Sequence, residues 1–126
     1  MTDNATAVVL VVDDESLVRD LVSRALLDAG FTVLVAESGE EALLISGGYT
    51  GVIHLLLSDV RMPGMDGLSV CGALVAKRPG LRCMLMTGYA DVSSGGLPVL
   101  YKPFRSDELV SRVRGLLAPS SAVGSN

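Results

Sequence analysis

Hydrophobic residues along this chain come in short runs, separated by segments with helical spacing of apolar side chains. Five runs of five to seven mainly apolar residues are typical of strands: Ala7–Val12, Phe31–Ala36, Val52–Ser58, Leu81–Met86 and Leu97–Tyr101. The third run, VIHLLLS, is nearly continuous rather than alternating. A continuous run indicates a strand that is buried on both faces, as in a parallel sheet covered by helices on its two sides.

Four segments between or after these runs carry helix signals. One places leucine, valine and alanine at helical spacing and is followed by Gly30, a common helix end. Another opens with SGEE at residues 38–41, which has the S-x-x-E form of a capping box. Ser106 is expected to cap the last helix, with acidic residues in its first turn. The predicted helices are Ser16–Ala29, Ser38 to about Ser46, Gly67–Lys77 and Ser106–Leu117.

The alternation of strands and helices predicts one doubly wound α/β domain with a parallel sheet. A chain of 126 residues fits a single domain, long enough to bury about two-thirds of the surface that the unfolded chain exposes. We expect an N-terminal extension at 1–6, the folded domain at 7–118 and a disordered tail at 119–126. In such sheets, ligands bind outside the carboxyl ends of the strands.

Composition and charge exclude several classes of protein. Hydrophobic residues make up 49% of the chain, but no apolar run approaches the roughly 18 to 20 residues of a membrane span. The N-terminus has no basic start of the kind found in secretory signals, so we expect a cytoplasmic protein without membrane insertion. The net charge is −4 and the ten basic residues form no stripe, which argues against direct nucleic-acid binding. Cys71 and Cys83 lack metal-site spacing and are expected to pack in the core.

Polar side chains follow four of the five predicted strands. Asp13 and Asp14 follow the first strand, Asp59 the third, Thr87 the fourth and Lys102 the fifth. All five should therefore lie on one rim of the sheet. Carboxylates about 4 Å apart repel by roughly 4 kcal/mol per pair at a protein surface, so three of them require a cation. Mg²⁺ fits, because it is commonly held by one or two carboxylates, waters and a phosphate.

The position of Asp59 indicates what this rim does. A buried strand delivers its carboxylate to the rim, and the turn through Pro63 and Gly64 leaves that face open. A carboxylate oxygen beside a metal is a nucleophile for a phosphoryl group, and aspartyl phosphate is a known covalent intermediate. Lys102 and Thr87 would share the phosphoryl charge with the metal. His54 lies near the start of the same strand, far from this rim, and is interpreted as structural.

Four motifs in the chain resemble those of the receiver domain of two-component response regulators, over about residues 7–118. They are the Asp13-Asp14 pair, SDVRMPGMDG around Asp59, MTGYAD around Thr87 and YKPF around Lys102. The resemblance implies a flavodoxin-like five-stranded sheet of order 2-1-3-4-5. It also implies that Asp59 takes a phosphoryl group from the phosphohistidine of a histidine kinase or histidine phosphotransfer domain. Slow self-catalysed hydrolysis would follow, so the domain would not be an enzyme in the ordinary sense.

The same resemblance assigns roles to individual side chains. It implies that Asp14 and Asp59 bind Mg²⁺ directly, that Asp13 acts mostly through water, and that the main-chain carbonyl of Arg61 completes the protein ligands. Thr87 would hydrogen-bond the phosphoryl group and Lys102 would form an ion pair with it.

Two departures from the family pattern lie near the fifth strand. Val99 stands where the family usually has an aromatic residue, and the link from Thr87 to Lys102 is about seven residues shorter than usual. The ten residues from Thr87 to Gly96 must return the chain along the length of a strand, roughly 17 to 20 Å. As a helix they would rise only about 15 Å. The fourth family helix is therefore predicted to be shortened or missing, with at most one turn in residues 88–96. In this respect the chain looks more like receivers attached to hybrid histidine kinases.

Two alternatives from other classes stay open. One is a Mg²⁺-dependent phosphatase that works through an aspartyl phosphate, but the haloacid-dehalogenase group needs Asp-x-Asp where this chain has the adjacent Asp13 and Asp14. The other is a receiver-like binding module that no longer accepts phosphate. The intact set of Asp59, Thr87 and Lys102 argues against that reading.

Overall fold

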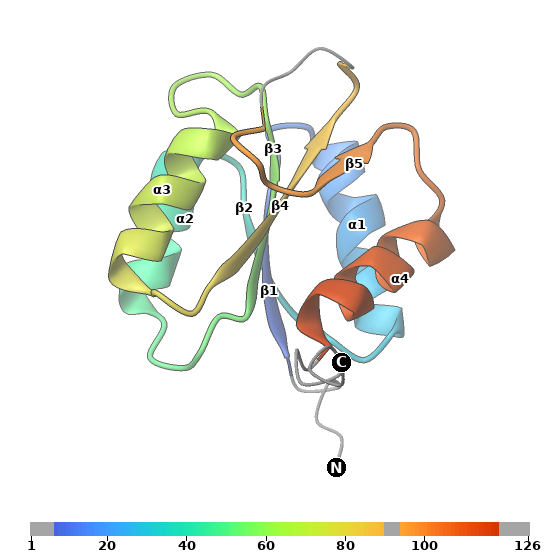
Figure 1. Ribbon diagram of the computed structural model, residues 1–126, viewed down its shortest axis with the longest axis horizontal. Coiled ribbons are helices and arrows are strands. Elements are labelled where there is room, and N and C mark those ends of the chain that lie inside the picture. Colours follow the sequence, from blue (N-terminus) through green and yellow to red (C-terminus); the bar gives the residue numbers. More distant parts are fainter. Residues whose placement is uncertain (1–6, 90–93, 119–126) are drawn as a thin grey trace.

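One parallel sheet of five strands forms the centre of the computed structural model, which describes residues 7–89 and 94–118 (Figure 1). The strand order is β2-β1-β3-β4-β5, which confirms the predicted flavodoxin-like topology. The strands are β1 Val8–Val12, β2 Thr32–Ala36, β3 Leu55–Asp59, β4 Arg82–Thr87 and β5 Val99–Tyr101. The helices are α1 Ser16–Asp28, α2 Gly39–Gly48, α3 Gly67–Lys77 and α4 Ser106–Leu117.

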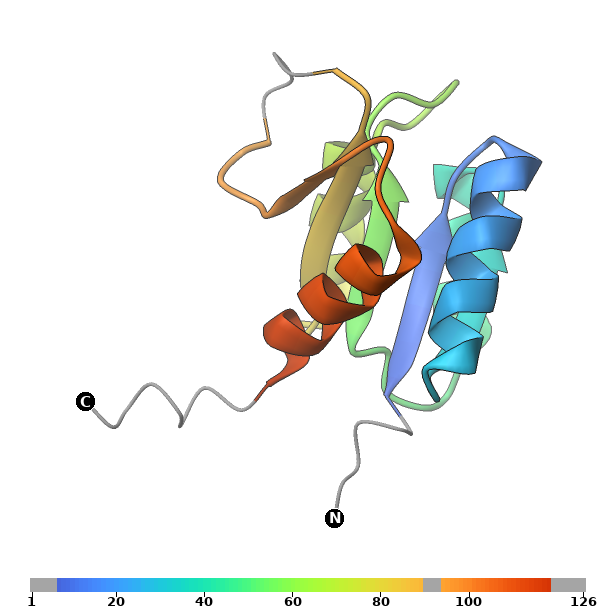
Figure 2. The same cartoon turned by 90° about the vertical axis from the view of Figure 1, so that its right-hand side faces the viewer.

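Helices cover both faces of the sheet, as the continuous third apolar run predicts. α1 and α4 lie on one face, and α2 and α3 lie on the other (Figures 1 and 2). All residues of β1 and β3 are buried, and alternate residues of β1 contribute to the two separate core clusters. Two-sided burial makes these central strands rigid supports for whatever lies at their carboxyl ends.

A local sequence signal explains where α2 begins but not where α4 begins. The Ser38 hydroxyl accepts the backbone N–H of Glu41, so the predicted Ser38 cap is confirmed at the start of α2, which runs to Gly48. The Glu41 carboxylate accepts the backbone N–H of Glu37 rather than that of Ser38, so the second bond of a capping box is not formed. At α4 the predicted cap is wrong. Ser106 is the first helical residue, and Arg105 is the N-cap, in extended conformation without a side-chain cap. The Arg105 side chain instead pairs with Asp107 at 3.1 Å.

The start of β3 differs from the prediction. The strand begins at Leu55 rather than Val52, and Val52 is 64% exposed. His54 explains the change, because its backbone N–H donates to the carbonyl of Val8 and its ring Nδ1 accepts the Val8 N–H, both at 2.9 Å. The His54 ring thus takes the place of a backbone carbonyl as the acceptor for the Val8 N–H at the start of the sheet. The structural interpretation of His54 is confirmed.

The two cysteines are buried against the α2 and α3 face of the sheet, as predicted for core packing. Burial raises the pKa of the Cys83 thiol far above its ordinary value. The buried Cys83 therefore stays protonated and unreactive at neutral pH.

The link between β4 and β5 is short and irregular where it is described. Residues 88–89 and 94–98 contain no helix, and Gly95 and Gly96 take φ angles of 62° and 90° that favour glycine. The prediction for residues 88–96 falls partly on 90–93, which lie outside the described residues, as do the extension at 1–6 and the tail at 119–126. No helix in the described ranges is both long and apolar enough to span a membrane.

Candidate functional site

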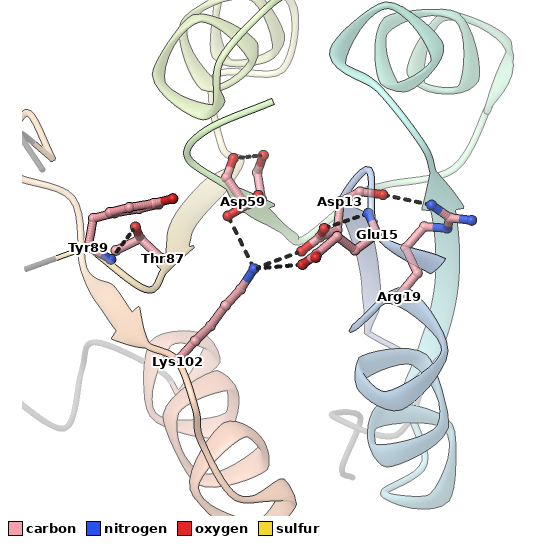
Figure 3. Close-up of polar contacts among 8 residues, drawn as sticks. Asp13, Glu15, Arg19, Asp59, Thr87, Tyr89 and Lys102 are labelled. Carbon is pink, nitrogen blue, oxygen red and sulfur yellow. Dashed lines mark hydrogen bonds and ion pairs between the residues drawn. The ribbon is translucent and has the colours of Figure 1, made fainter. Parts of the chain in front are cut away.

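The carboxyl ends of the strands bring Asp13, Asp59, Thr87 and Lys102, four of the predicted polar residues, to one rim (Figure 3). Val12 pairs with Ser58, so Asp13 and Asp59 each lie one residue further along two adjacent strands. Asp59 in turn pairs with Met86, and Thr87 ends the next strand. The backbone N–H of Lys102 donates to the Thr87 carbonyl at 2.8 Å, which places Lys102 beside this rim.

Three carboxylates form an acidic cluster at the rim, defined by Asp13, Asp14 and Asp59. One carboxylate oxygen from each lies within 4.8 Å of the others. Asp13 is fully buried and Asp59 is 8% exposed, whereas Asp14 is exposed. Oxygen donors at this spacing, partly buried and open on one side, suit a hard divalent cation that keeps some of its waters.

Lys102 lies between two members of the acidic cluster. Its Nζ is 3.3 Å from Asp13 Oδ2 and 3.3 Å from Asp59 Oδ1. Burial raises the pKa of Asp59 to about 6, with Lys102 opposing the rise and Asp13 and Asp14 adding to it. Burial would lower the pKa of Lys102, but the charges of Asp59 and Asp13 outweigh it and raise that pKa. The ammonium therefore compensates only part of the negative charge.

Thr87 is buried at the end of β4, and its hydroxyl oxygen accepts the backbone N–H of Tyr89 at 3.0 Å. That contact leaves the hydroxyl proton free to be donated. In the described part of the chain this hydroxyl forms no hydrogen bond with Asp59 or Lys102. The structure therefore places Thr87 on the predicted rim but does not join it to the charged groups.

A surface hollow of about 480 Å³ opens beside the acidic cluster. We call it the rim hollow; it is lined by Asp14, Glu15, Asp59, Arg61, Gly88, Tyr89 and Lys102. It leads from the surface to the Asp59 carboxylate. The predicted role of the Arg61 main-chain carbonyl stays a prediction, although Arg61 does line the hollow.

Sequence reasoning missed three residues of this site. Glu15 Oε1 lies 3.9 Å from Lys102 Nζ. The backbone N–H of Glu15 donates to Asp13 Oδ1 at 2.9 Å. Arg19 donates from α1 to the Asp13 carbonyl at 2.8 Å, which fixes the turn that presents the acidic pair. Tyr89 lines the hollow two residues after Thr87. Nearness to the acidic pair could have indicated Glu15, but side-chain reach from a helix or a loop has no sequence signal.

Gly67 allows α3 to start directly behind Asp59. Its backbone N–H donates to the Val60 carbonyl at 2.9 Å, and a Cβ at this position would lie 2.4 Å from the Asp59 carbonyl oxygen. No side chain larger than hydrogen fits that approach without a shift of the backbone that carries Asp59.

Comparisons with known proteins agree with this geometry. The family model described as response regulator receiver domain matches residues 9–114. The DNA-binding transcriptional regulator NtrC of Salmonella typhimurium is 39% identical over 113 residues, covering 84% of this chain and 24% of that protein. The chain thus spans about a quarter of the length of the NtrC proteins it matches.

Two solved structures share the fold at substantial identity. The receiver domain from the hybrid histidine kinase CckA is 38% identical with a TM-score of 0.73, covering 89% of this chain and 100% of that one. The response regulator TrrA of Thermotoga maritima, in complex with Mg(2+)-BeF, is 36% identical with a TM-score of 0.76 at the same coverage of both chains. With the matched family model, the sheet order and the clustered rim residues, these likenesses show that the chain belongs to the response regulator receiver domain family.

Proposed function

We propose that Asp59 is the phosphoacceptor of this receiver domain and takes its phosphoryl group from the phosphohistidine of a partner protein. The observation that carries this proposal is the Asp59 carboxylate itself. It ends a fully buried strand, opens into the rim hollow and lies 3.3 Å from the Lys102 ammonium. A nucleophile on a rigid strand beside a cation is arranged to receive an anionic group.

Mg²⁺ is the cofactor that the donor set supports. Asp14 and Asp59 would bind it directly, Asp13 mostly through water, and the Arg61 carbonyl would complete the protein ligands. When bound, the ion offsets the charge of the acidic cluster and of the incoming phosphoryl oxygens. The structural likeness to TrrA, which was solved with Mg(2+)-BeF, supports this choice of metal.

The transfer itself is a displacement at phosphorus. A carboxylate oxygen of Asp59 attacks, the new O–P bond forms, and the N–P bond of phosphohistidine breaks with its electron pair remaining on the imidazole. Lys102 pairs with the phosphoryl oxygens, and the Thr87 hydroxyl donates its free proton to one of them. Water later cleaves the O–P bond and returns the carboxylate and inorganic phosphate. The domain therefore catalyses only its own modification, and we do not class it as an enzyme.

The partners follow from this chemistry. A histidine kinase or a histidine phosphotransfer domain supplies the phosphoryl group, in the cytoplasm, and a protein downstream reads the modified state. The relatives include a receiver on a transcriptional regulator and a receiver on a hybrid kinase. Either setting is compatible with a domain that does not itself bind nucleic acid.

Intact-mass measurement after incubation with acetyl phosphate and Mg²⁺ tests the proposal. The protein should gain one phosphoryl group, and the gain should vanish with EDTA or in Asp59→Asn. Asp66→Asn is a matched control, because Asp66 is an exposed N-cap carboxylate of α3 outside the acidic cluster. Equal phosphorylation of Asp59→Asn and wild type would refute the assignment of Asp59.

A further inference from the structure

Strand β2 forms one edge of the sheet, and part of its backbone faces away from the other strands. Within residues 7–89 and 94–118, β2 pairs with β1 alone. Backbone groups of Thr32 and Ala36 bond to the residues that flank β1, at the two ends of this ladder. Because backbone groups alternate in direction along a strand, Leu34 also faces β1, whereas Val33 and Val35 face outward. These two valines therefore present N–H donors and carbonyl acceptors at the open edge.

The sequence of β2 contains none of the features that usually prevent an edge strand from pairing. Such strands are commonly protected by lysine, by proline or by a β-bulge. The segment TVLVA has no charged residue and no proline, and its register with β1 is continuous. Val35 is also 46% exposed. The edge of β2 is therefore apolar, regular and accessible.

The opposite edge of the same sheet is protected. β5 has only three residues and follows directly after Pro98. The Arg112 side chain donates to the Val99 carbonyl of this strand at 3.0 Å and so occupies one of its outward acceptors. The two edges of one sheet thus differ, and β2 is the edge that remains available for pairing.

The backbone and side chains of β2 are complementary to a second β2. Antiparallel pairing about Leu34 places Val33 of each copy opposite Val35 of the other, and the outward groups of each such pair exchange two N–H···O bonds. Val33 packs toward the α1 and α4 face of the sheet, and Leu34 packs toward the α2 and α3 face. In this register valine faces valine and leucine faces leucine, so apolar cross-strand pairs form on both faces.

The charges at the two ends of β2 favour the same antiparallel arrangement. Three exposed glutamates, Glu37, Glu40 and Glu41, lie just after the strand. Arg114 lies near its other end, where the guanidinium donates to the carbonyl of Ala29. Antiparallel pairing places the acidic end of each copy beside the end of the other copy that carries Arg114, and it separates the two acidic ends by the length of the strand. Parallel pairing would bring the glutamates of both copies together.

We propose that the edge of β2 is an interface for a second copy of this chain, which joins the two five-stranded sheets into one through an antiparallel, two-fold β2–β2 pair. The same patch serves both copies, as in the two-fold dimers that are the commonest oligomers. β2 contributes no side chain to the rim hollow. The association therefore leaves Asp59 open, and it does not rest on the proposed function.

Sedimentation equilibrium of the full chain, from micromolar to millimolar concentration, tests the interface. The mass should rise from 13.1 kDa toward twice that value. Val35→Lys places a charge opposite Val33 in both cross-strand pairs and should raise the Kd of the dimer about tenfold. Val52→Lys is the matched control, because it makes the same change of residue and charge at a 64% exposed valine outside β2, and it should leave the Kd unchanged.

Amide exchange of the wild type measured by NMR gives a readout that needs no substitution. At high concentration the N–H groups of Val33 and Val35 should exchange about tenfold more slowly than in dilute protein. The N–H of Leu34, which already faces β1 in the monomer, should not change. A monomer at every concentration, a dimer that Val35→Lys leaves intact or that Val52→Lys weakens equally, or unchanged exchange at Val33 and Val35 would each overturn the proposal.

Discussion

The Lys102 ammonium lies 3.3 Å from Asp59 Oδ1, across the gap between the ends of β5 and β3. The same Nζ is 3.3 Å from Asp13 Oδ2, so one cation is divided between two carboxylates. Because the side chain of Lys102 is 21% exposed, these contacts are only partly screened by water. Lys102 is thus a compensating charge in the unmodified domain and a partner for the phosphoryl group in the modified one.

Removing this charge should change the titration of Asp59. In Lys102→Met the domain should keep its fold, while the pKa of Asp59 should rise above the value of about 6 in the wild type, because the opposing charge is lost. Carbon-detected NMR titration of the Asp59 carboxyl group in metal-free protein measures this directly. An unchanged pKa would show that Lys102 does not interact with Asp59 in solution.

Lys102 should also couple the phosphoryl group to the rest of the domain. Phosphorylated Lys102→Met should show smaller chemical-shift changes than phosphorylated wild type, because the phosphoryl group loses its ion-pair partner just after β5. Changes of equal size in both proteins would count against this role.

Stability of the metal-free domain should depend on pH through Asp59. The pKa of Asp59 is about 6 in the folded state against an ordinary value of 3.8, so the folded state binds the proton more tightly. This group therefore has no effect on folding below about pH 4 and opposes it by about 3 kcal/mol above about pH 6, so the free energy of unfolding falls as the pH rises between these values. Denaturant unfolding in EDTA at pH 5 and pH 8, with Asp59→Asn alongside, measures the effect. A difference between the two proteins that is the same at both pH values would contradict it.

Mg²⁺ should stabilise the domain through Asp14. The ion binds the folded acidic cluster, and at about 100 times Kd it should add about 2.7 kcal/mol to the free energy of unfolding. Thermal melts with and without Mg²⁺ should show a rise in Tm in wild type and in Asp20→Ala, an exposed carboxylate on α1, but not in Asp14→Ala. Should Asp14→Ala keep the full rise, Asp14 is not a ligand.

Gly67 should be needed for the position of Asp59. A Cβ in Gly67→Ala would lie 2.4 Å from the Asp59 carbonyl oxygen, so the backbone must shift, at a cost of about 1 to 3 kcal/mol, and phosphorylation should slow. Gly72→Ala is the matched control on the same helix, because it meets nothing within 4 Å. It should stabilise by about 0.5 to 1 kcal/mol. Unfolding and phosphorylation rates measured for both variants decide between a specific and a general effect.

Much of this protein could be predicted from local patterns. A run such as that of β3, buried on both faces, is recognisable because two-sided burial removes the alternation of polar residues. Asp13, Asp59, Thr87 and Lys102 were predicted to share a rim because all parallel strands end at the same edge of the sheet. These inferences need only periodicity and topology, which a single sequence carries.

Contacts that depend on side-chain reach were decided by the tertiary structure. Three such contacts join residues from different elements. They are the ion pairs of Lys102 with two carboxylates, the stacking of Arg61 on Tyr89 and the hydrogen bond from Arg19 to the Asp13 carbonyl. The start of β3 at Leu55 depends on the hydrogen bond between the His54 ring and the Val8 N–H. The N-cap of α4 depends on the extended backbone conformation of Arg105. Periodicity is a property of one segment, whereas these contacts depend on the distance and angle between two segments, which arise only when the sheet and its loops have formed.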